Sequence, residues 1–132
     1  MARRTALAVL CALSPAAVAA QEIDCAAPAT QLEMTACAAR GWQAADAELN
    51  RAYGVAIDRA RAMDAGLAPG QDPAEEMLRE AQRAWISFRD KACAAESLVA
   101  RGGSMQPMLV YLCLERLTRQ RSADLERFGT LE

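Results

Sequence analysis

Cysteine is the residue type with the clearest chemical potential in this sequence. The chain has five cysteines and no histidine, so the usual Ser–His and Cys–His nucleophile pairs cannot form. No two cysteines have the C-x-x-C spacing of a redox or zinc site, and no metal is expected. An even number of cysteines in a small exported chain indicates disulfide bonds. The four that remain if a leader is removed are Cys25, Cys37, Cys93 and Cys113.

Acidic residues are the remaining candidates for catalysis. They are numerous, but they gather where helices are expected to start, and the helix dipole accounts for them there. With no histidine and with cysteines expected to be oxidised, no set of side chains has the spacing of a catalytic site. We therefore predict a protein that is not an enzyme and that needs no cofactor.

The first 20 residues have the layout of a secretory signal. A basic pair at 3–4 precedes a short apolar run at 5–13 and small residues at 15–20. The apolar run is shorter than the roughly 20 residues that span a bilayer. We predict a signal peptide over residues 1–20 and a single helical domain over 21–132. The protein is then periplasmic or secreted, with no membrane span after signal removal.

The predicted mature chain is mildly acidic. Removal of the leader takes away two of the 15 basic residues, which leaves 13 against 17 acidic residues and a formal charge of −4. This balance does not favour nucleic-acid binding, which requires a basic surface. It suits a cationic protein partner.

Apolar residues recur at steps of three or four along three segments, which is the spacing of one helix face. The first expected helix begins after Thr30, which forms a capping box with Glu33, and ends near Met63. Asp72 is the expected cap of the second helix and Ser104 that of the third. Short loops join the segments. The sequence therefore predicts an all-α fold, a three-helix antiparallel bundle with an N-terminal arm, stapled by disulfides.

The second helix is expected to direct an apolar stripe toward the other two. A broad stripe of this kind needs partners that cover it. Aromatic residues on such a stripe are more often core than binding platform. The members of the stripe are Leu78, Ala81, Trp85, Phe88, Ala92, Ala95 and Val99.

Hairpin geometry bears on the cysteine pairing. If the second hairpin turns near residue 102, Cys93 and Cys113 lie within about one helical turn of each other, or 5.4 Å along the axis. Cys25 precedes the first helix and Cys37 lies two turns inside it, so a bridge between them would hold the arm against its own helix. Four cysteines allow three connectivities, and this geometry favours Cys25–Cys37 with Cys93–Cys113.

A polar cluster is expected where the first two helices face each other. A turn near residue 68 places Asp46 opposite Arg89, with Asn50 one turn from Asp46 and Gln82 two turns from Arg89. The cluster would lie beside both tryptophans. One interpretation is an inter-helix salt bridge that fixes the register. The other is a ligand pocket that uses the same groups.

The tip of the second hairpin is a candidate contact loop for a partner. Two glycines before a serine and a methionine predict an exposed and adaptable turn. A plain turn with a helix cap is the alternative interpretation. The loop consists of Gly102, Gly103, Ser104 and Met105.

Five segments in this order resemble the lysozyme-inhibitor LprI-like family of small exported bacterial proteins. The resemblance covers nearly all of the predicted mature chain. It implies a helical, disulfide-containing periplasmic or envelope domain, and a founding member of the family is a lipoprotein that inhibits lysozyme. The segments are TQLEMTAC (30–37), WQAADAELNRAY (42–53), AQRAWISFRDKAC (81–93), GGSMQPM (102–108) and CLERLTRQR (113–121).

This chain departs from the lipoprotein pattern in one respect. Cys11 follows Leu10, where a lipoprotein signal needs a small residue, so we expect a free rather than an anchored protein. The resemblance implies an exported protein that binds and occludes a lysozyme-type peptidoglycan hydrolase. The alternative is an envelope module that binds another exported protein or a small ligand near Trp42, Trp85 and Arg89, without inhibiting a hydrolase. Lysozyme or another exported protein is thus the expected partner, and nucleic acid is not.

Overall fold

A computed structural model describes residues 23–130. The predicted all-α, three-helix bundle with an N-terminal arm is confirmed, and the described residues contain no strand. The predicted signal peptide, residues 1–20, lies outside the described residues. None of the described helices is both long enough and apolar enough to cross a bilayer. The elements are α1 (Gln31–Asp64), α2 (Ala74–Glu96), the 3-10 helix η1 (Ser97–Ala100) and α3 (Gln106–Arg127).

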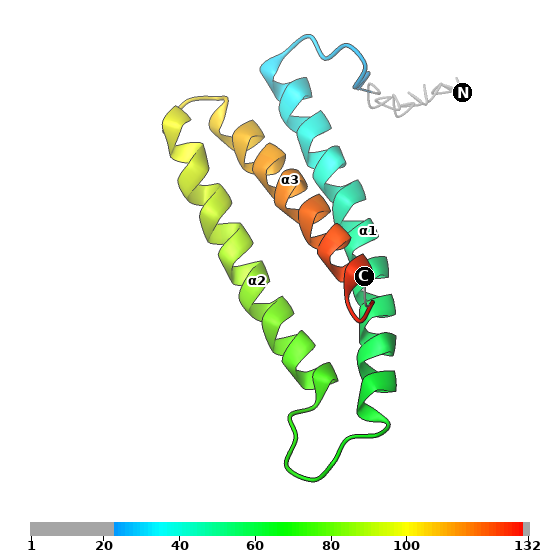
Figure 1. Cartoon of the computed structure of the whole chain (residues 1–132). Helices are drawn as coiled ribbons and strands as arrows, with labels where there is room; N and C mark the ends of the chain where they lie inside the picture. The colour runs from blue at the N-terminus through cyan, green and yellow to red at the C-terminus, as the bar shows by residue number, and fades with distance from the viewer. Residues whose placement is uncertain (1–22, 131–132) are drawn as a thin grey trace, which may run out of the picture.

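Helices that follow each other in sequence are antiparallel, so α1 and α3 run parallel to each other (Figure 1). The N-terminal arm and the η1–α3 turn lie at one end of the bundle, and the α1–α2 loop lies at the other. α3 packs more closely against α1 than α2 packs against either helix. The two parallel helices therefore form the body of the fold, and α2 is attached to it.

Small residues explain the close approach of α3 to α1. Five buried alanines recur on one face of α1 and leave room for the side chains of α3. Helix axes approach each other according to the size of the side chains between them. Leu125 of α3 is almost completely buried in the same core as Leu49 and Ile57 of α1. The five alanines are Ala38, Ala45, Ala52, Ala56 and Ala60.

The predicted capping box at the start of α1 is confirmed. The Glu33 amide donates to the Thr30 hydroxyl at 3.2 Å, and the Thr30 amide donates to the Glu33 carboxylate at 3.0 Å. The Ala29 amide also donates to Glu33, at 2.6 Å. These backbone donors, Ala29 first and Thr30 second, lower the pKa of the Glu33 carboxyl from its ordinary value.

The other two predicted caps are wrong. Asp64, at the end of α1, accepts from the amides of Ala74 and Glu75 at 2.7 and 3.0 Å, so it caps α2 in place of Asp72. The α1–α2 loop brings the end of one helix beside the start of the next, which local sequence does not reveal. Ser104 lies outside α3, because Met105 is the residue that precedes the first turn and no side chain caps it.

Both disulfide bonds favoured by the hairpin geometry are present. Cys25–Cys37 joins the arm to α1 with a Cα–Cα distance of 5.5 Å. Cys93–Cys113 joins α2 to α3 at 5.4 Å, and both of its cysteines are buried. The bundle is therefore stapled once at its arm and once across its core.

The predicted apolar stripe of α2 is wrong in part. Leu78 is buried as expected, but Phe88 is 60% exposed and Val99 is 86% exposed. Gln82 and Arg89 are buried in their place, together with Cys93 on the same face. Successive helical residues differ by about 100° in direction, so a helix that buries Arg89 directs Phe88 toward solvent. The bridge to α3 and the contacts of Arg89 fix this rotation.

Candidate functional site

The predicted polar cluster centres on Arg89, where α2 faces α1. Arg89 is 7% exposed. Its Nη1 lies 3.4 Å from Oδ1 of Asp46, and its Nε lies 2.9 Å from Oδ1 of the neighbouring Asp90. The predicted contact between Asp46 and Arg89 is therefore present, with a second carboxylate on the same guanidinium. A buried charge with two counter-ions avoids much of the cost of leaving water.

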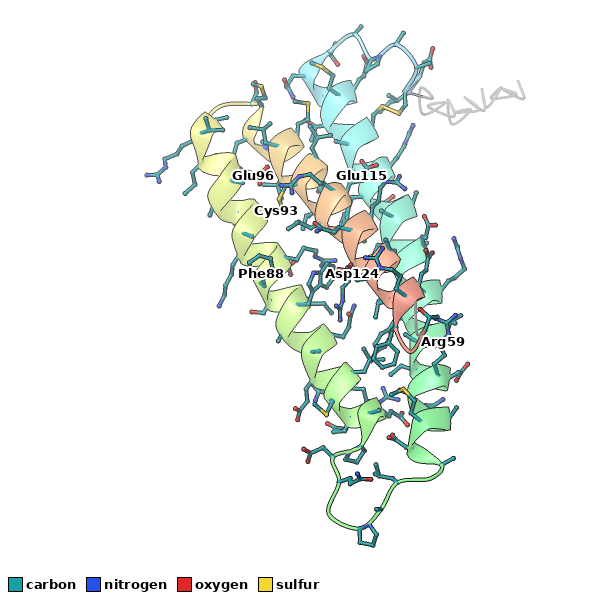
Figure 2. The ribbon with its side chains drawn as sticks, viewed as in Figure 1. Arg59, Phe88, Cys93, Glu96, Glu115 and Asp124 are labelled. Atoms are coloured by element: carbon teal, nitrogen blue, oxygen red, sulfur yellow. A yellow bond between two sulfur atoms is a disulfide. The ribbon has the colours of Figure 1, made fainter. Side chains whose placement is uncertain are left out.

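The guanidinium of Arg89 also lies between the two tryptophans. Its carbon is 5.2 Å from the ring centroid of Trp85 and 5.9 Å from that of Trp42, which are cation–π distances. Trp42 in turn lies 5.8 Å from the ring of Tyr111 on α3. The half-buried indoles thus link α1, α2 and α3 around one cation. Side chains from α2 and α3 fill the space between these two ribbons (Figure 2).

The other two predicted members of the cluster separate. Asn50 is exposed and donates to Oδ2 of Asp46 at 3.3 Å, so it belongs to the cluster. Gln82 accepts instead from Nε of Arg121 at 3.0 Å. The guanidinium carbon of Arg121 lies 6.0 Å from the ring of Trp85. The structure therefore brings Asp46, Asn50 and Arg89 together and places Gln82 with an arginine of α3.

Sequence reasoning did not find Arg121. A signal for it existed, because a hairpin that turns near residue 102 and brings Cys93 close to Cys113 also places Gln82 opposite Arg121. That register had been applied to the cysteines alone. Arg121 contacts Trp85 from the side of α3, so the polar contacts of α2 extend to both of its neighbours.

The arrangement around Arg89 favours the register interpretation over the ligand pocket. Two carboxylates and two indoles already occupy the directions in which a guanidinium binds. Across the part of the chain that the structure describes, no group of three or more His, Cys, Asp or Glu side chains could hold a metal ion. The cluster can orient α2, and it offers no group with the environment of an acid, base or nucleophile.

The predicted contact loop lies at the end of the bundle that also carries the arm (Figure 1). All four of its residues are exposed. Gly102 has a φ of +76°, which favours glycine, and its amide donates to Oε1 of Gln106 at 3.0 Å. The Gly103 amide donates to the carbonyl of Ala100 at 2.9 Å. The loop is therefore a held turn and not a loose one.

Apolar side chains surround this loop. Ser104 and Pro107 form one wall of a hollow of about 240 Å³, and the other wall is the first turn of α1. Arg101 precedes the glycines, is exposed, and makes no ion pair within the described residues. The exposed apolar side chains at this end are Leu32, Leu98, Val99 and Met105.

Comparison with known proteins gives a family match over most of the chain. The family model described as lysozyme inhibitor LprI matches residues 24–125, a range that contains both disulfides, the polar cluster and the contact loop. An uncharacterized protein of Rhizobium meliloti (strain 1021) is 42% identical over 121 residues, which cover 89% of this chain and 87% of that protein. No solved structure matches.

Proposed function

The chain belongs to the LprI family of lysozyme inhibitors, and from this premise we propose that it binds a lysozyme-type peptidoglycan hydrolase and occludes the active-site cleft. The observation that carries the proposal is the family match over residues 24–125. The disulfide-stapled bundle supports it, because a rigid surface loses little entropy when it binds. Inhibition then needs shape and charge, and it needs no chemistry from the inhibitor.

The contact loop is the part of the surface that we propose to enter the cleft. Most glycoside hydrolases act with two carboxyl groups on either side of the scissile bond. An exposed guanidinium complements such a site, and Arg101 lies directly before the turn of Gly102 and Gly103. Val99 and Met105 provide apolar contacts on either side of this turn. The loop combines a narrow backbone, one cation and an apolar border.

Charge beyond the loop would act on the rate of association. The predicted mature charge of −4 attracts a cationic hydrolase over distances comparable to the Debye length, about 10 Å at 0.1 M salt. Such steering raises the association rate more than it raises the final affinity. Added salt should therefore weaken inhibition through slower association.

A lysis assay tests the proposal. Bacterial cell walls are exposed to several lysozyme types with increasing amounts of purified, disulfide-oxidised protein. We expect dose-dependent protection against at least one type, and weaker protection as salt is added. Absence of protection against every type at micromolar inhibitor would refute the proposed function.

Two arginine variants separate the loop from general electrostatics. Arg101→Glu reverses the charge beside the loop and should weaken inhibition by about tenfold or more, since charge-assisted contacts are among the strong ones. Arg51→Glu makes the same change at an exposed position in the middle of α1, away from the loop, and should change inhibition little. Equal effects of the two substitutions would reject the loop as the contact surface while leaving inhibition itself intact.

We also propose an exported location. Disulfide bonds persist in oxidising compartments such as the periplasm, and the two bridges here agree with that environment. Residues 1–20 would be a removed signal peptide and residues 21–132 the mature single domain. The mass of the exported protein measures where the chain is cleaved.

A further inference from the structure

An apolar hollow of about 430 Å³ opens between the end of α1, the start of α2 and the end of α3. α1 and α2 continue past the last turn of α3 toward their common loop, so one side of this hairpin is not covered by a third helix (Figure 1). The hollow lies toward the opposite end of the bundle from the contact loop. Its apolar walls include Met63, Met77, Leu78, Ala81 and Phe128.

One charged group, Arg121, lines this otherwise apolar hollow. Arg121 is half-buried, donates through Nε to Gln82, and stacks on Trp85. It makes no ion pair with any acid of the described residues, and its two Nη atoms donate no hydrogen bond there. Arg89, by contrast, has two carboxylates within reach. The hollow thus presents a held guanidinium that lacks a counter-ion.

We propose that this hollow binds a small carboxylic acid with an unbranched apolar tail, a ligand of the fatty-acid class. A guanidinium fixed through Nε keeps its Nη atoms available for a carboxylate, the group that it binds best in the plane. The tail would lie among Met63, Met77 and Phe128, and unbranched methionine side chains adapt to such ligands. The binding would be independent of hydrolase inhibition, since the contact loop lies at the other end of the bundle.

The size of the hollow favours a small ligand over a protein. Ligand sites usually enclose about 300–1,000 Å³, with mostly apolar walls and a few polar groups. The hollow of about 430 Å³ has this size and this division between apolar wall and single charge. A stable protein interface covers about 800 Å² on each partner, which is more surface than one hollow of this kind provides.

Calorimetric titration with three decyl compounds tests the proposal. Decanoate, decanol and decylamine share one tail and differ in the charge of the head group. We expect decanoate to bind the purified, oxidised protein with one site and to change the fluorescence of Trp85, which lies beside Arg121. Decanol should bind about tenfold more weakly, because it forms no charge-assisted pair, and decylamine more weakly still. Equal binding of all three compounds, or no binding of decanoate, would overturn the proposal.

Variants locate the site and protect the test against misfolding. Arg121→Gln should weaken decanoate binding about tenfold and leave decanol binding unchanged, since it removes the charged partner. Arg51→Gln removes an equal charge from an exposed position outside the hollow and should leave the affinity for decanoate unchanged. If decanoate binds Arg121→Gln as tightly as it binds the unmodified protein, Arg121 is not the head-group site and the proposal fails.

A second pair of variants avoids the core. Ala81 is exposed and lines the hollow, so Ala81→Glu should place an acid beside the guanidinium and abolish decanoate binding without unfolding the bundle. Ala84→Glu is the matched control on the exposed side of the same helix. Sedimentation of the unmodified protein provides the last check. A dimer that dissociates in Ala81→Glu and not in Ala84→Glu would show that a second copy of the chain occupies the hollow, and would overturn the proposal.

Discussion

The interface between α1 and α3 and the interface of α2 with both helices are stabilised by different forces. Alanines of α1 and Leu125 of α3 meet in a close apolar contact that has no charged member. α2 contributes an arginine, a glutamine, a tryptophan and a disulfide to its own interface. Apolar burial is proportional to area and has little directional preference. Ion pairs, cation–π contacts and disulfides, in contrast, each require one geometry.

This difference explains the rotation of α2. A helix attached by area alone would bury its most apolar face, and Phe88 belongs to that face of α2. Directional contacts made by Arg89 and Cys93 select another face, and Phe88 is left 60% exposed. Burial of an aromatic side chain is worth about 1.5–3 kcal/mol. The directional contacts together must exceed that amount to hold the observed rotation.

Removal of the core disulfide should have the largest effect on this difference. The double change Cys93→Ala with Cys113→Ala is expected to lower the free energy of unfolding by about 2–4 kcal/mol. The bridge holds α2 to the body of the fold, and both cysteines are buried. Denaturant unfolding followed by far-ultraviolet circular dichroism measures the loss.

The arm disulfide is the matched control. Cys25→Ala with Cys37→Ala also removes one bridge, but it releases an exposed arm from α1 and leaves the contacts of α2 intact. Its enclosed loop is also shorter, with a sequence separation of 12 against 20, and stabilisation grows with loop length. We therefore expect the smaller loss here. A larger loss from the arm bridge would show that α2 does not depend on its disulfide.

Loss of the Arg89 cation should have the next largest effect. Arg89→Met keeps much of the side-chain volume and removes the ion pairs and the cation–π contacts. We expect a loss of about 2 kcal/mol. This is less than the 3–5 kcal/mol typical of breaking a fully buried pair, because the side chain of Asp46 is 40% exposed. Arg51→Met on the exposed face of α1 should change stability by no more than about 0.5 kcal/mol.

A double-mutant cycle then isolates the inter-helix pair. Asp46→Asn should cost less than Arg89→Met, because Asp90 continues to neutralise the guanidinium. The coupling between positions 46 and 89 measures what the contact between α1 and α2 contributes. An Arg89→Met protein as stable as the unmodified one would mean that apolar burial can hold α2 as well, and the comparison between the two interfaces would fail.

The same division decides how much of the fold the sequence could predict. Helical periodicity, the capping box at Thr30 and the cysteine pairing all depend on local spacing or on one hairpin register, and each is present in the structure. The Asp46–Arg89 contact follows from the register as well. Features that repeat along the chain or across one turn are thus readable without coordinates.

Features that depend on the rotation of a whole helix were not readable in this way. The stripe through Phe88 is the more apolar one, and no local signal shows that Arg89 would be buried between two indoles instead. Asp72 and Asp64 both lie near the start of α2, and the path of the loop decides which of them reaches the free amides. Arg121 became part of the site through α3, whose position relative to α1 depends on packing and not on a short turn.

The smallest expected effect concerns the exposed contact between α1 and α2 near their loop. Glu75 lies 3.0 Å from Nε of Arg61 and also accepts from Arg79, so these two arginines, Arg61 first, lower the pKa of its carboxyl from the ordinary value of 4.5. A carboxyl with a lowered pKa in the folded state stabilises the protein above its unfolded pKa, and this contribution is lost as the pH falls through the folded pKa. Glu75→Gln should therefore reduce stability at neutral pH and flatten the loss of stability in acid. Unfolding free energies measured from neutral to acidic pH test this, with Glu80→Gln as the control, because Glu80 makes no ion pair within the described residues. Exposed pairs contribute about 0–1 kcal/mol, so a Glu75 effect as large as that of Arg89 would show that the surface of α2, and not its buried face, holds it to α1.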